Sequence, residues 1–425
     1  MNVRLASVSS RGLIKKIAKP TALDSLARQI VLSRLEMIRE GQIVISENGE
    51  QTTFGRITRE YPLTALVRVL DPKFYSDIAF GGSIGAGEAY IHGHWACVEL
   101  TELLRILIGN RDVLEQVDSG LARLHAPLQK LLHALKRNTR KGSRENIAAH
   151  YDLGNDFYRL WLDQSMMYSC AYFDTPAMSL EDAAIGKLDR ICRKLDLSSD
   201  DSVLEIGTGW GGFAIHAARH YGCHVTTTTI SQQQYSYAKQ AIHDSGLDDK
   251  ITLLNMDYRD LKGRYDKLVS IEMIEAVGHE YHGTFFKKCC DLLKPDGQML
   301  LQAITIADQR YHQYKNSVDF INRYIFPGGC LTSVTDMFRT MTRHTDMRAI
   351  HVEDIGPHYA KTLRHWHDRF FARIDEVREL GYSDAFIRMW QFYLCYCESA
   401  FIERAIGDVQ MLIIRPGARR EEIRY

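Results

Sequence analysis

The sequence predicts an α/β protein with a doubly wound, mostly parallel sheet and a small N-terminal α+β domain. An apolar strand at 203–206 runs directly into a glycine-rich turn, and a helix pattern follows from 213 to 220. Strand and helix patterns then alternate as far as residue 304, which is typical of a parallel sheet that binds ligands at the carboxyl ends of its strands. The length of 425 residues exceeds one typical core, so two domains are expected.

Composition and charge limit the possible functions. An apolar content of 45% and an aromatic content of 10% suffice for well-packed cores. The net charge is zero, so no nucleic acid is expected as a partner. The nine cysteines lack metal-ligand spacing, which predicts free thiols in a reducing cytoplasm and no metal site. We find no apolar run long enough to span a membrane and no secretory signal.

The first domain is expected to cover residues 1–145 and to be a small α+β unit. A glycine-rich stretch at 81–87 lacks the Gly-Lys-Ser/Thr ending of a phosphate-binding loop, so we expect a packing turn there. Basic residues concentrate at 11–19 and 136–144 and are candidates for contact with anionic lipid. The remaining patterns predict helices at 21–40, 100–108 and 121–135 and strands at 42–47, 51–58 and 63–70.

The second domain, residues 146–425, is expected to hold the main sheet. Ser179, with Asp182 three residues later, is a typical start for a helix at 180–195. A final helix at 383–404 is apolar on nearly all sides, so it should be buried or line an apolar cavity. The other patterns predict strands at 223–230, 251–256, 267–271 and 298–304, a helix at 281–293, and helical insertions between 308 and 345.

The turn after the first strand of this domain has the features of a nucleotide-binding loop. Gly207, Gly209 and Gly212 fit the G-x-G-x-x-G of dinucleotide enzymes, in which glycine permits positive φ and close approach of a ligand. An NAD site also needs an acidic residue at the end of the next strand to bind the ribose. The strand at 223–230 is followed by no such carboxylate, so NAD is not expected.

The loop instead resembles the nucleoside-binding loop of S-adenosylmethionine (SAM) methyltransferases, with Glu205 just before the first glycine. The plain alternative is a tight turn without a ligand. Three glycines, Trp210 and the Thr-x-Ser-x-x-Gln run from 229 to 234 are difficult to explain by packing alone.

Five stretches of the sequence, the glycine loop among them, have the residues, order and spacing of motifs in one family. They are Tyr-Ser-Cys-Ala-Tyr-Phe at 168–173, the glycine loop at 207–212, Ser-Ile-Glu-Met-Ile-Glu-Ala-Val-Gly at 270–278, Tyr-Ile-Phe-Pro-Gly-Gly at 324–329 and His-Tyr-Ala-Lys-Thr-Leu at 358–363. Together they resemble the cyclopropane-fatty-acyl-phospholipid synthases, relatives of the mycolic acid cyclopropane synthases. The resemblance covers about residue 146 to the end, and residues 71–110 resemble the N-terminal domain of the full-length bacterial enzymes.

The resemblance implies a SAM site. The residues placed on this cofactor are Tyr168, Ser169, Glu205, Gly207, Gly209, Gly211, Thr229, Ser231 and Gln234, with Asp257 and Tyr258 near its adenine.

The resemblance also implies that a bicarbonate ion is bound as the catalytic base. Its ligands would be Cys170 through the backbone, Glu275, Ile304 and Tyr359, with Tyr151 close by. This chain departs from the family at Gln302, where those enzymes typically carry histidine; an amide can donate a hydrogen bond but cannot titrate.

The chemistry of the implied reaction agrees with these residue types. An alkene that attacks the SAM methyl group leaves a carbocation, which needs a dry pocket and a base. Aromatic faces stabilise such a cation by roughly 0.5–2 kcal/mol each. Aromatic residues are plentiful in the matching motifs: Tyr151, Tyr168, Tyr172, Phe173, Tyr324, Phe326 and Tyr359.

Four functions are therefore open. The first is methylene transfer across a cis double bond of an unsaturated phospholipid, giving a cyclopropane fatty acid. The second is methyl transfer to the same lipid, giving a methyl- or methylene-branched chain, which the weaker base implied by Gln302 would favour. The third is N-methylation of a small amine, which would need a polar pocket. The fourth, a non-catalytic lipid-binding protein, would predict a degraded SAM loop. We expect a cytoplasmic enzyme, peripheral to the inner face of the membrane, and a possible homodimer.

Overall fold

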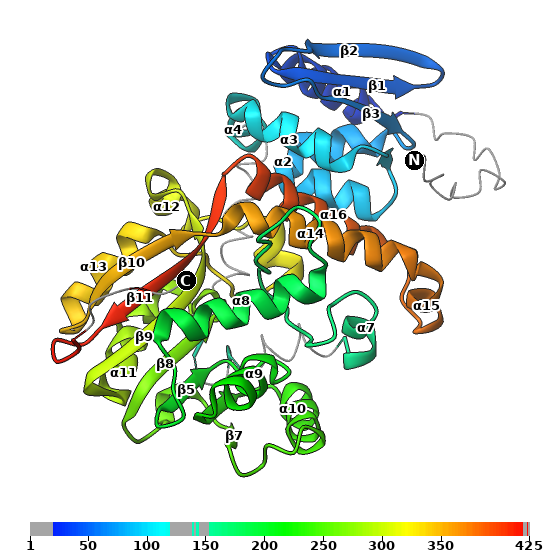
Figure 1. Ribbon diagram of the computed structural model, residues 1–425. Helices are drawn as coiled ribbons and strands as arrows, with labels where there is room; N and C mark the ends of the chain where they lie inside the picture. Colours follow the sequence, from blue (N-terminus) through cyan, green and yellow to red (C-terminus); the bar gives the residue numbers. More distant parts are fainter. Residues whose placement is uncertain (1–19, 120–137, 140–141, 144–152, 420–422, 424–425) are drawn as a thin grey trace.

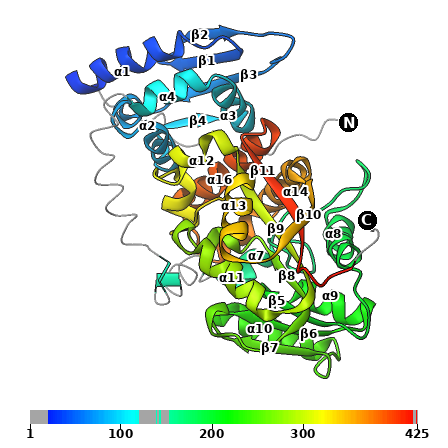
Figure 2. The same ribbon diagram turned by 90° about the vertical axis from the view of Figure 1, so that its left-hand side faces the viewer.

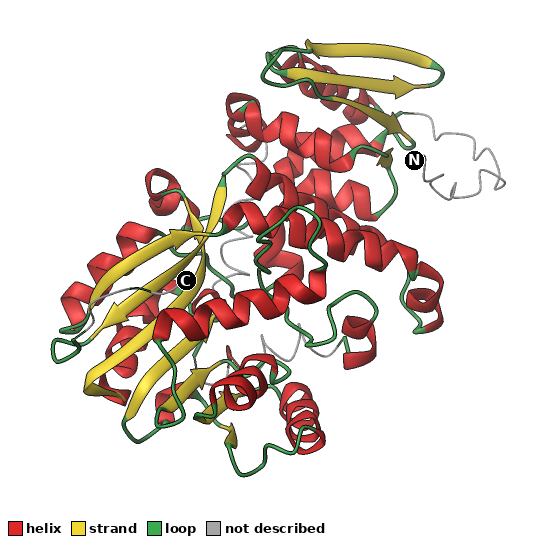
Figure 3. Cartoon of the chain, in the orientation of Figure 1, coloured by secondary structure: helices red, strands yellow, loops and turns green. Residues whose placement is uncertain are grey.

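The computed structural model describes residues 20–119, 138–139, 142–143, 153–419 and 423. A large sheet with helices on both faces occupies one end of the molecule, and a small unit of strands and helices from the N-terminal residues occupies the other (Figure 1). Two long helices, α14 (Gly356–Ala372) and α16 (Asp384–Ile402), lie between these parts in both views (Figure 2). The elements at this junction are drawn in red as helices in Figure 3.

The large sheet has seven strands in the order β10-β11-β9-β8-β5-β6-β7. The neighbours from β9 to β7 pair in parallel, whereas β11 is antiparallel to both β9 and β10. This confirms the predicted doubly wound, mostly parallel sheet. Its strands are β5 (Ser202–Ile206), β6 (His224–Thr229), β7 (Ile251–Asn255), β8 (Tyr265–Ile271), β9 (Leu293–Ile306), β10 (Arg348–Asp354) and β11 (Ile406–Ile414).

Alternate residues of the central strands pack into different cores on the two faces of the sheet. Leu204 and Leu301 belong to the core that includes α11 and α13, whereas Val203 and Leu300 belong to the core that includes α8 and α9. Burial on both faces explains why these strands read as continuous apolar runs. The helices of this part are α7 (Asn155–Arg159), α8 (Leu180–Leu195), α9 (Gly212–Tyr221), α10 (Gln232–Asp244), α11 (His282–Leu292), α12 (Asp308–Tyr314), α13 (Val334–His344) and α15 (Ile374–Glu379).

The N-terminal unit contains a four-stranded sheet in the order β2-β1-β3-β4. Its first two strands form a hairpin whose turn, Asn48-Gly49, has φ values of 52° and 87°. Asn-Gly is the favoured pair for such a turn, because both positions need positive φ. The elements are α1 (Ala22–Leu35), β1 (Gly41–Glu47), β2 (Glu50–Arg56), β3 (Thr64–Val69), α2 (Lys73–Ile91), β4 (Trp95–Cys97), α3 (Leu100–Gly109) and α4 (Arg111–Ser119).

The glycine-rich stretch at 81–87 is not the packing turn that the sequence predicts, because it lies inside α2. The helix is interrupted only at Gly82, which has φ 62° and ψ −146°. A Cβ atom at Gly87 would lie 2.7 Å from the Phe320 ring, so this glycine allows another segment to approach the helix closely. The prediction that the stretch serves packing rather than phosphate binding agrees with this contact.

Helix α16 joins the two parts of the molecule. Thr101 of α3 donates a 2.9 Å hydrogen bond to Glu398, and Arg105 forms a 2.7 Å ion pair with Glu403. Trp390 and Phe401 belong to one continuous core with residues of the N-terminal unit such as Leu103. The helix is thus buried and, as shown below, lines a cavity, which confirms the expectation for 383–404.

Several boundaries differ from the predicted ones. Helix α1 ends at Leu35 rather than at 40, and Gly41 opens β1 with positive φ. The insertion between 308 and 345 is not one helix but α12, a π-helical segment η5 (Ile321–Ile325) and α13. The two antiparallel strands β10 and β11 were not predicted. The expected helix at 121–135, the domain boundary at 145 and the basic run at 11–19 lie outside the described residues, as does most of the run at 136–144.

All nine cysteines are free thiols, as expected. None of the helices in the described part of the chain combines the length and apolar character that a membrane span requires.

Candidate active site

A cavity of about 1120 Å³ opens at the carboxyl ends of β5, β6, β8 and β9. One wall is formed by the glycine loop. The opposite wall comes from α16 and from Leu103, Leu104 and Leu107 on α3 of the N-terminal unit. This edge of a doubly wound sheet is where ligands bind. The cavity therefore continues from the place expected for a nucleoside to an apolar region between the two parts of the molecule.

The glycine loop is shaped for a ligand at one position in particular. Gly207 and Gly209 line the cavity with φ values of 105° and 54°, and a Cβ atom at Gly209 would meet no atom within 4 Å. That position therefore faces open space in the cavity wall, where a ligand could approach the backbone. Gly211, also predicted as a cofactor residue, is not among the lining residues; it caps α9 with φ 96°.

Glu205 lies behind this loop and is 2% exposed. Its carboxyl group accepts a 2.6 Å hydrogen bond from Thr227, which is 2.6 Å from the Thr208 hydroxyl. Burial raises the pKa of Glu205 to about 8. The residue lines the cavity and ties β5 to β6 below the turn.

Thr229 and Gln234 lie together at the end of β6, with Thr229 Oγ1 donating a 2.9 Å hydrogen bond to Gln234 Oε1. Both line the cavity, whereas Ser231 is not among the lining residues and instead caps α10 by accepting a hydrogen bond from the Gln234 N–H. Asp257 and Tyr258 follow β7 and also line the cavity.

The Asp257 carboxylate is engaged by the Arg259 guanidinium, with N–O distances of 2.8 and 2.7 Å. Tyr258 packs its ring edge-on against Phe285 at 5.6 Å. Both residues are therefore fixed, as a site for a flat heterocycle requires. Their contact with an adenine stays a prediction.

Tyr168 and Ser169 reach the cavity from the segment before α8. The Tyr168 hydroxyl is 2.7 Å from that of Tyr393 on α16. Ser169 accepts a 2.8 Å hydrogen bond from Lys187, an ammonium group that is fully buried. Burial lowers the pKa of Lys187. The nearby acidic groups oppose that change, and Glu272 has the largest opposing effect.

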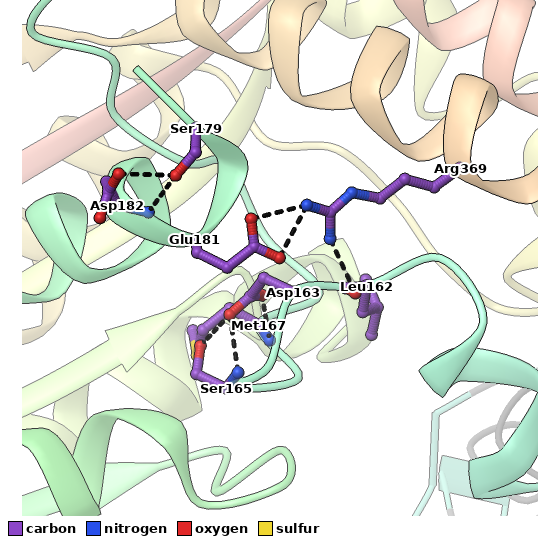
Figure 4. A network of polar contacts seen from close by, with 8 residues as sticks. All are labelled: Leu162, Asp163, Ser165, Met167, Ser179, Glu181, Asp182 and Arg369. Atoms are coloured by element: carbon purple, nitrogen blue, oxygen red, sulfur yellow. Dashed lines mark hydrogen bonds and ion pairs between the residues drawn. The ribbon is translucent and has the colours of Figure 1, made fainter.

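Figure 4 shows how the segment that leads to Tyr168 is held in place. Arg369 of α14 binds both oxygens of Glu181, at 2.7 and 2.6 Å, and donates to the carbonyl of Leu162 at 3.2 Å. Asp163 accepts a hydrogen bond from the Met167 N–H at 3.0 Å. Contacts from α14 and within the segment itself therefore fix the backbone that presents the predicted cofactor residues.

An anion-binding cradle lies at the end of β8, and it holds the carboxylate of Glu272. The Cys170 N–H donates to Glu272 Oε1 at 2.8 Å, and Gln302 Nε2 donates to the same oxygen at 2.7 Å. The Tyr359 hydroxyl donates to Oε2 at 2.7 Å. Cys170 is fully buried and burial raises the pKa of its thiol well above the usual value, so the thiol is not suited to act as a thiolate, and the contact that Cys170 makes in the cradle is through its backbone N–H.

Gln302 is held in one orientation by its neighbours. Its Oε1 accepts a hydrogen bond from Gln410 at 3.1 Å, and Gln410 in turn accepts one from Lys194 at 2.8 Å. The Gln302 amide nitrogen therefore faces both Glu272 and Asp408, the latter at 3.0 Å. A glutamine at this position can bridge two carboxyl groups while accepting from a third residue.

Glu275 and Ile304 form a second contact beside the cradle. The Ile304 N–H donates to Glu275 Oε1 at 2.5 Å, while the buried Oε2 atom has no hydrogen-bond partner. Burial, and then the neighbouring Glu272, raise the pKa of Glu275 to about 8. A large fraction of this carboxyl group is thus protonated near neutral pH.

The predicted bicarbonate ligands do not fit the ion in this arrangement. The Cys170 N–H, the Tyr359 hydroxyl and Gln302 all donate to Glu272, so the donors that would hold the ion are in use. Another anion would also stand beside the carboxyl groups of Glu272 and Glu275, which both line the cavity. Tyr151, the remaining expected neighbour, lies outside the described residues.

The aromatic residues of the motifs divide into two groups. Tyr168, Phe326 and Tyr359 line the cavity, and Tyr359 stacks on Phe401 with ring centroids 4.4 Å apart. The others are not among the lining residues: Tyr172 lies beneath the Arg190 guanidinium, Phe173 stacks on His365, and Tyr324 hydrogen-bonds Glu88.

Sequence reasoning missed two members of the site and undervalued a third. Asp408 and Lys187 are fully buried beside the cradle but lie outside the motifs in sequence. An acid in the middle of the apolar run 406–414, and a lysine on the apolar face of a helix, were the available signals. Glu272 was noticed only as one of two acids after a strand.

The sequence model of the mycolic acid cyclopropane synthetase family matches residues 138–411. Tuberculostearic acid methyltransferase UfaA1 of Mycobacterium tuberculosis is 38% identical over 79% of this chain and 80% of its own length. The cyclopropane-fatty-acyl-phospholipid synthase of Escherichia coli is 37% identical over 82% of this chain and 87% of its own length.

Solved structures agree with the sequence matches. The mycolic acid cyclopropane synthase CmaA1, complexed with SAH and CTAB, superposes with a TM-score of 0.60 at 31% identity, covering 64% of this chain and 98% of that one. Coclaurine N-methyltransferase, at 20% identity and a TM-score of 0.52, shares the fold alone. The family match spans more than half of the sequence, so the chain belongs to the mycolic acid cyclopropane synthetase family and is a SAM-dependent methyltransferase.

Proposed function

We propose that this enzyme transfers one carbon from SAM to the cis double bond of an unsaturated phospholipid acyl chain, giving a cyclopropane fatty acid. The observation that carries the proposal is the continuous cavity, which runs from the glycine loop past aromatic rings to the apolar side chains of α3. A nucleoside fits the polar end, and an acyl chain fits the apolar end.

The protein supplies the site, and SAM when bound supplies an electrophilic methyl group. Gly209 leaves room for the nucleoside, and the buried Lys187 holds Ser169 beside it. Attack by the alkene would leave a cation on the acyl chain, and the stacked rings of Tyr359 and Phe401 in the cavity wall would lie beside it. Each such ring contributes on the order of 0.5–2 kcal/mol of stabilisation, and the apolar walls exclude the water that would trap the cation.

A second product has support of its own. The relative at 38% identity is named a tuberculostearic acid methyltransferase, and the cradle of this chain holds Glu272 and Gln302 where the resemblance implies bicarbonate and histidine. Loss of a proton from a different carbon of the same cation would give a methyl- or methylene-branched chain. Amine N-methylation has less support, because α3 and α16 make much of the wall apolar.

The enzyme must reach acyl chains without a spanning helix among its described residues, so we propose that it docks on the bilayer from the cytoplasmic side. The basic sequences at 11–19 and 136–144 have the charge suited to anionic headgroups. A homodimer stays a prediction.

The test is expression in a bacterial host that makes unsaturated phospholipids and lacks a cyclopropane synthase. We expect part of the acyl chains to gain the mass of one CH₂, and fragmentation then separates a ring from a branch. The matched control is Gly209→Val, which should give no shift. Unchanged acyl chains in cells that contain the folded protein would contradict the proposal.

A further inference from the structure

We propose that the carboxylate of Glu272 is the base of this enzyme, in place of a bound bicarbonate ion. The inference rests on the proposed function and deepens it, since it names the group that receives the proton.

The geometry gives Glu272 the position of a bound anion. Three donors from three separate segments converge on its two oxygens: the Cys170 N–H at 2.8 Å, Gln302 Nε2 at 2.7 Å and the Tyr359 hydroxyl at 2.7 Å. A carboxylate and a bicarbonate ion are both planar anions with the same pair of acceptor oxygens. The resemblance predicts Cys170 and Tyr359 as ligands of the ion, and Gln302 stands where the family typically carries histidine. The Glu272 carboxylate therefore accepts the hydrogen bonds that a bound ion would otherwise accept.

Glu272 also faces the place where a proton must be removed. It is only partly buried and lines the cavity, as do Glu275 and Tyr359. Asp408, by contrast, is fully buried and is not among the lining residues. Of the two carboxyl groups that Gln302 bridges, only Glu272 is accessible to a ligand in the cavity.

The surrounding charges favour one ionised carboxyl group at Glu272. Burial, followed by the nearby Glu272, raises the pKa of Asp408 well above its usual range, which favours the protonated form of Asp408. Burial also raises the pKa of Glu272, but the Cys170 N–H, the Tyr359 hydroxyl and the Lys187 charge oppose that rise. A base whose proton affinity is raised in this way is suited to proton abstraction near neutral pH.

The backbone at Glu272 supports a special role. Its φ of 47° is in the left-handed region, which costs a non-glycine residue about 1–2 kcal/mol. Its own N–H is bound to the Gln302 carbonyl at 2.9 Å, which holds the residue in that conformation. Backbone strain of this kind is retained where the position of a side chain matters.

The step is balanced without a further reactant. A C–H bond on the methyl group added to the acyl chain breaks, its electron pair closes the ring onto the cationic carbon, and the proton passes to Glu272. The carboxylate becomes a carboxylic acid and returns the proton to water after the product leaves.

The first experiment measures turnover of purified enzyme on unsaturated phospholipid vesicles, in carbonate-depleted buffer and with added bicarbonate. We expect the same rate in both buffers. Glu272→Gln should lower turnover by roughly 10²–10⁴-fold while the affinity for S-adenosylhomocysteine stays within a few-fold. The matched control is Glu280→Gln at an exposed position, which should keep full turnover.

A second variant guards against loss of the fold. Glu272→Gly relieves the positive φ and empties the cradle, so added formate or bicarbonate should restore part of its turnover. Binding of ¹³C-bicarbonate, followed by NMR line broadening, is independent of activity: we expect binding to Glu272→Gly and none to the unmodified protein.

Bicarbonate dependence of the unmodified enzyme, or its binding of the labelled ion, would overturn the inference, as would full turnover of Glu272→Gln. If the unmodified enzyme shows no turnover on any lipid, the proposed function fails instead, and the NMR comparison still decides whether Glu272 fills the ion site.

Discussion

At the scale of residues, backbone conformation and buried charge define the site. Gly209 combines a φ of 54° with open space in front of its missing side chain. Gly246 has a similar φ of 65° and equally open space, but it is not among the residues that line the cavity. Substitution of Gly246 therefore reports the cost of backbone strain alone, whereas substitution of Gly209 also reports the effect on a ligand in the cavity.

Gly209→Val should abolish binding of S-adenosylhomocysteine, because the new side chain would occupy the space that a nucleoside needs. Gly246→Val should lose a similar amount of stability, about 1–2 kcal/mol, and keep its affinity. Calorimetry on the two folded variants makes the comparison. If both variants bind S-adenosylhomocysteine as tightly as the unmodified protein does, the glycine loop is not part of the cofactor site.

Glu205 predicts how stability depends on pH. Its pKa is raised from 4.5 to about 8 by burial, so between these values the folded protein holds a proton that the unfolded chain releases. The free energy of unfolding should therefore fall as pH rises from about 5 to about 8. A tenfold difference in proton affinity corresponds to about 1.4 kcal/mol, so the effect is on the order of a few kcal/mol.

In Glu205→Gln this contribution is absent, and the melting temperature should fall less steeply with pH than in the unmodified protein. Glu50→Gln on the exposed β2 strand is the control and should follow the unmodified curve. Thermal melts without cofactor, at several pH values, measure both. Parallel curves for all three proteins would show that Glu205 does not titrate in this range.

The fold of the glycine loop is predictable from the sequence, because a strand, a turn and a helix adjacent in the chain build it. Glu272, Asp408 and Lys187 were harder to predict, because they meet only after folding. Gln302 looked like a weakened ligand from the sequence. Its role as a bridge between two carboxyl groups depends on Gln410, which comes from a neighbouring strand.

At the scale of elements, α16 connects the cavity to the N-terminal unit. Ala400 lines the cavity on this helix, whereas Ala385 is exposed on the same helix. Ala400→Phe should fill space that an acyl chain needs and lower kcat/KM on phospholipid by at least about tenfold, with overpacking costing about 1–3 kcal/mol. Affinity for S-adenosylhomocysteine should stay within a few-fold.

Ala385→Phe provides the matched control and should leave kcat/KM unchanged. Turnover on vesicles of phospholipids with unsaturated chains is the measurement. If both variants are equally active, the acyl chain does not run along α16.

The sequence predicted helices and strands correctly where hydrophobic periodicity was strong. It failed where tertiary packing overrides the local preference of the residues. The aromatic helix at 383–404 was expected to be buried or to line a cavity, and α16 does both. The stretch at 81–87 looked like a turn because glycine disfavours helices. Packing against Phe320 and Phe392 at Gly87 overrides that preference, and such tertiary contacts cannot be seen in a single sequence.

At the scale of the whole molecule, the two parts share a core and a cavity. The N-terminal unit therefore contributes to the cavity itself. The proposed docking on a bilayer depends on the basic sequence at 136–144. Replacing Lys136, Arg137, Arg140 and Lys141 with Ser should weaken binding to anionic vesicles, and salt should do the same, because exposed charges are screened within about 8–10 Å.

The control replaces four exposed basic residues elsewhere, Arg219, Lys239, Lys262 and Lys287, with Ser. Cosedimentation with vesicles at low and physiological salt compares the proteins. If vesicle binding is unchanged both by salt and by the substitutions at 136–141, the docking surface lies elsewhere.

The most direct test of one-carbon transfer to an acyl chain uses SAM with a trideuterated methyl group, purified enzyme and vesicles of unsaturated phospholipid. We predict that the acyl chain gains one carbon that carries two deuterium atoms, since one is lost to the base, and that one S-adenosylhomocysteine forms per modified chain. Formation of S-adenosylhomocysteine without deuterium in the acyl chains, or with label in the headgroup instead, would contradict the account.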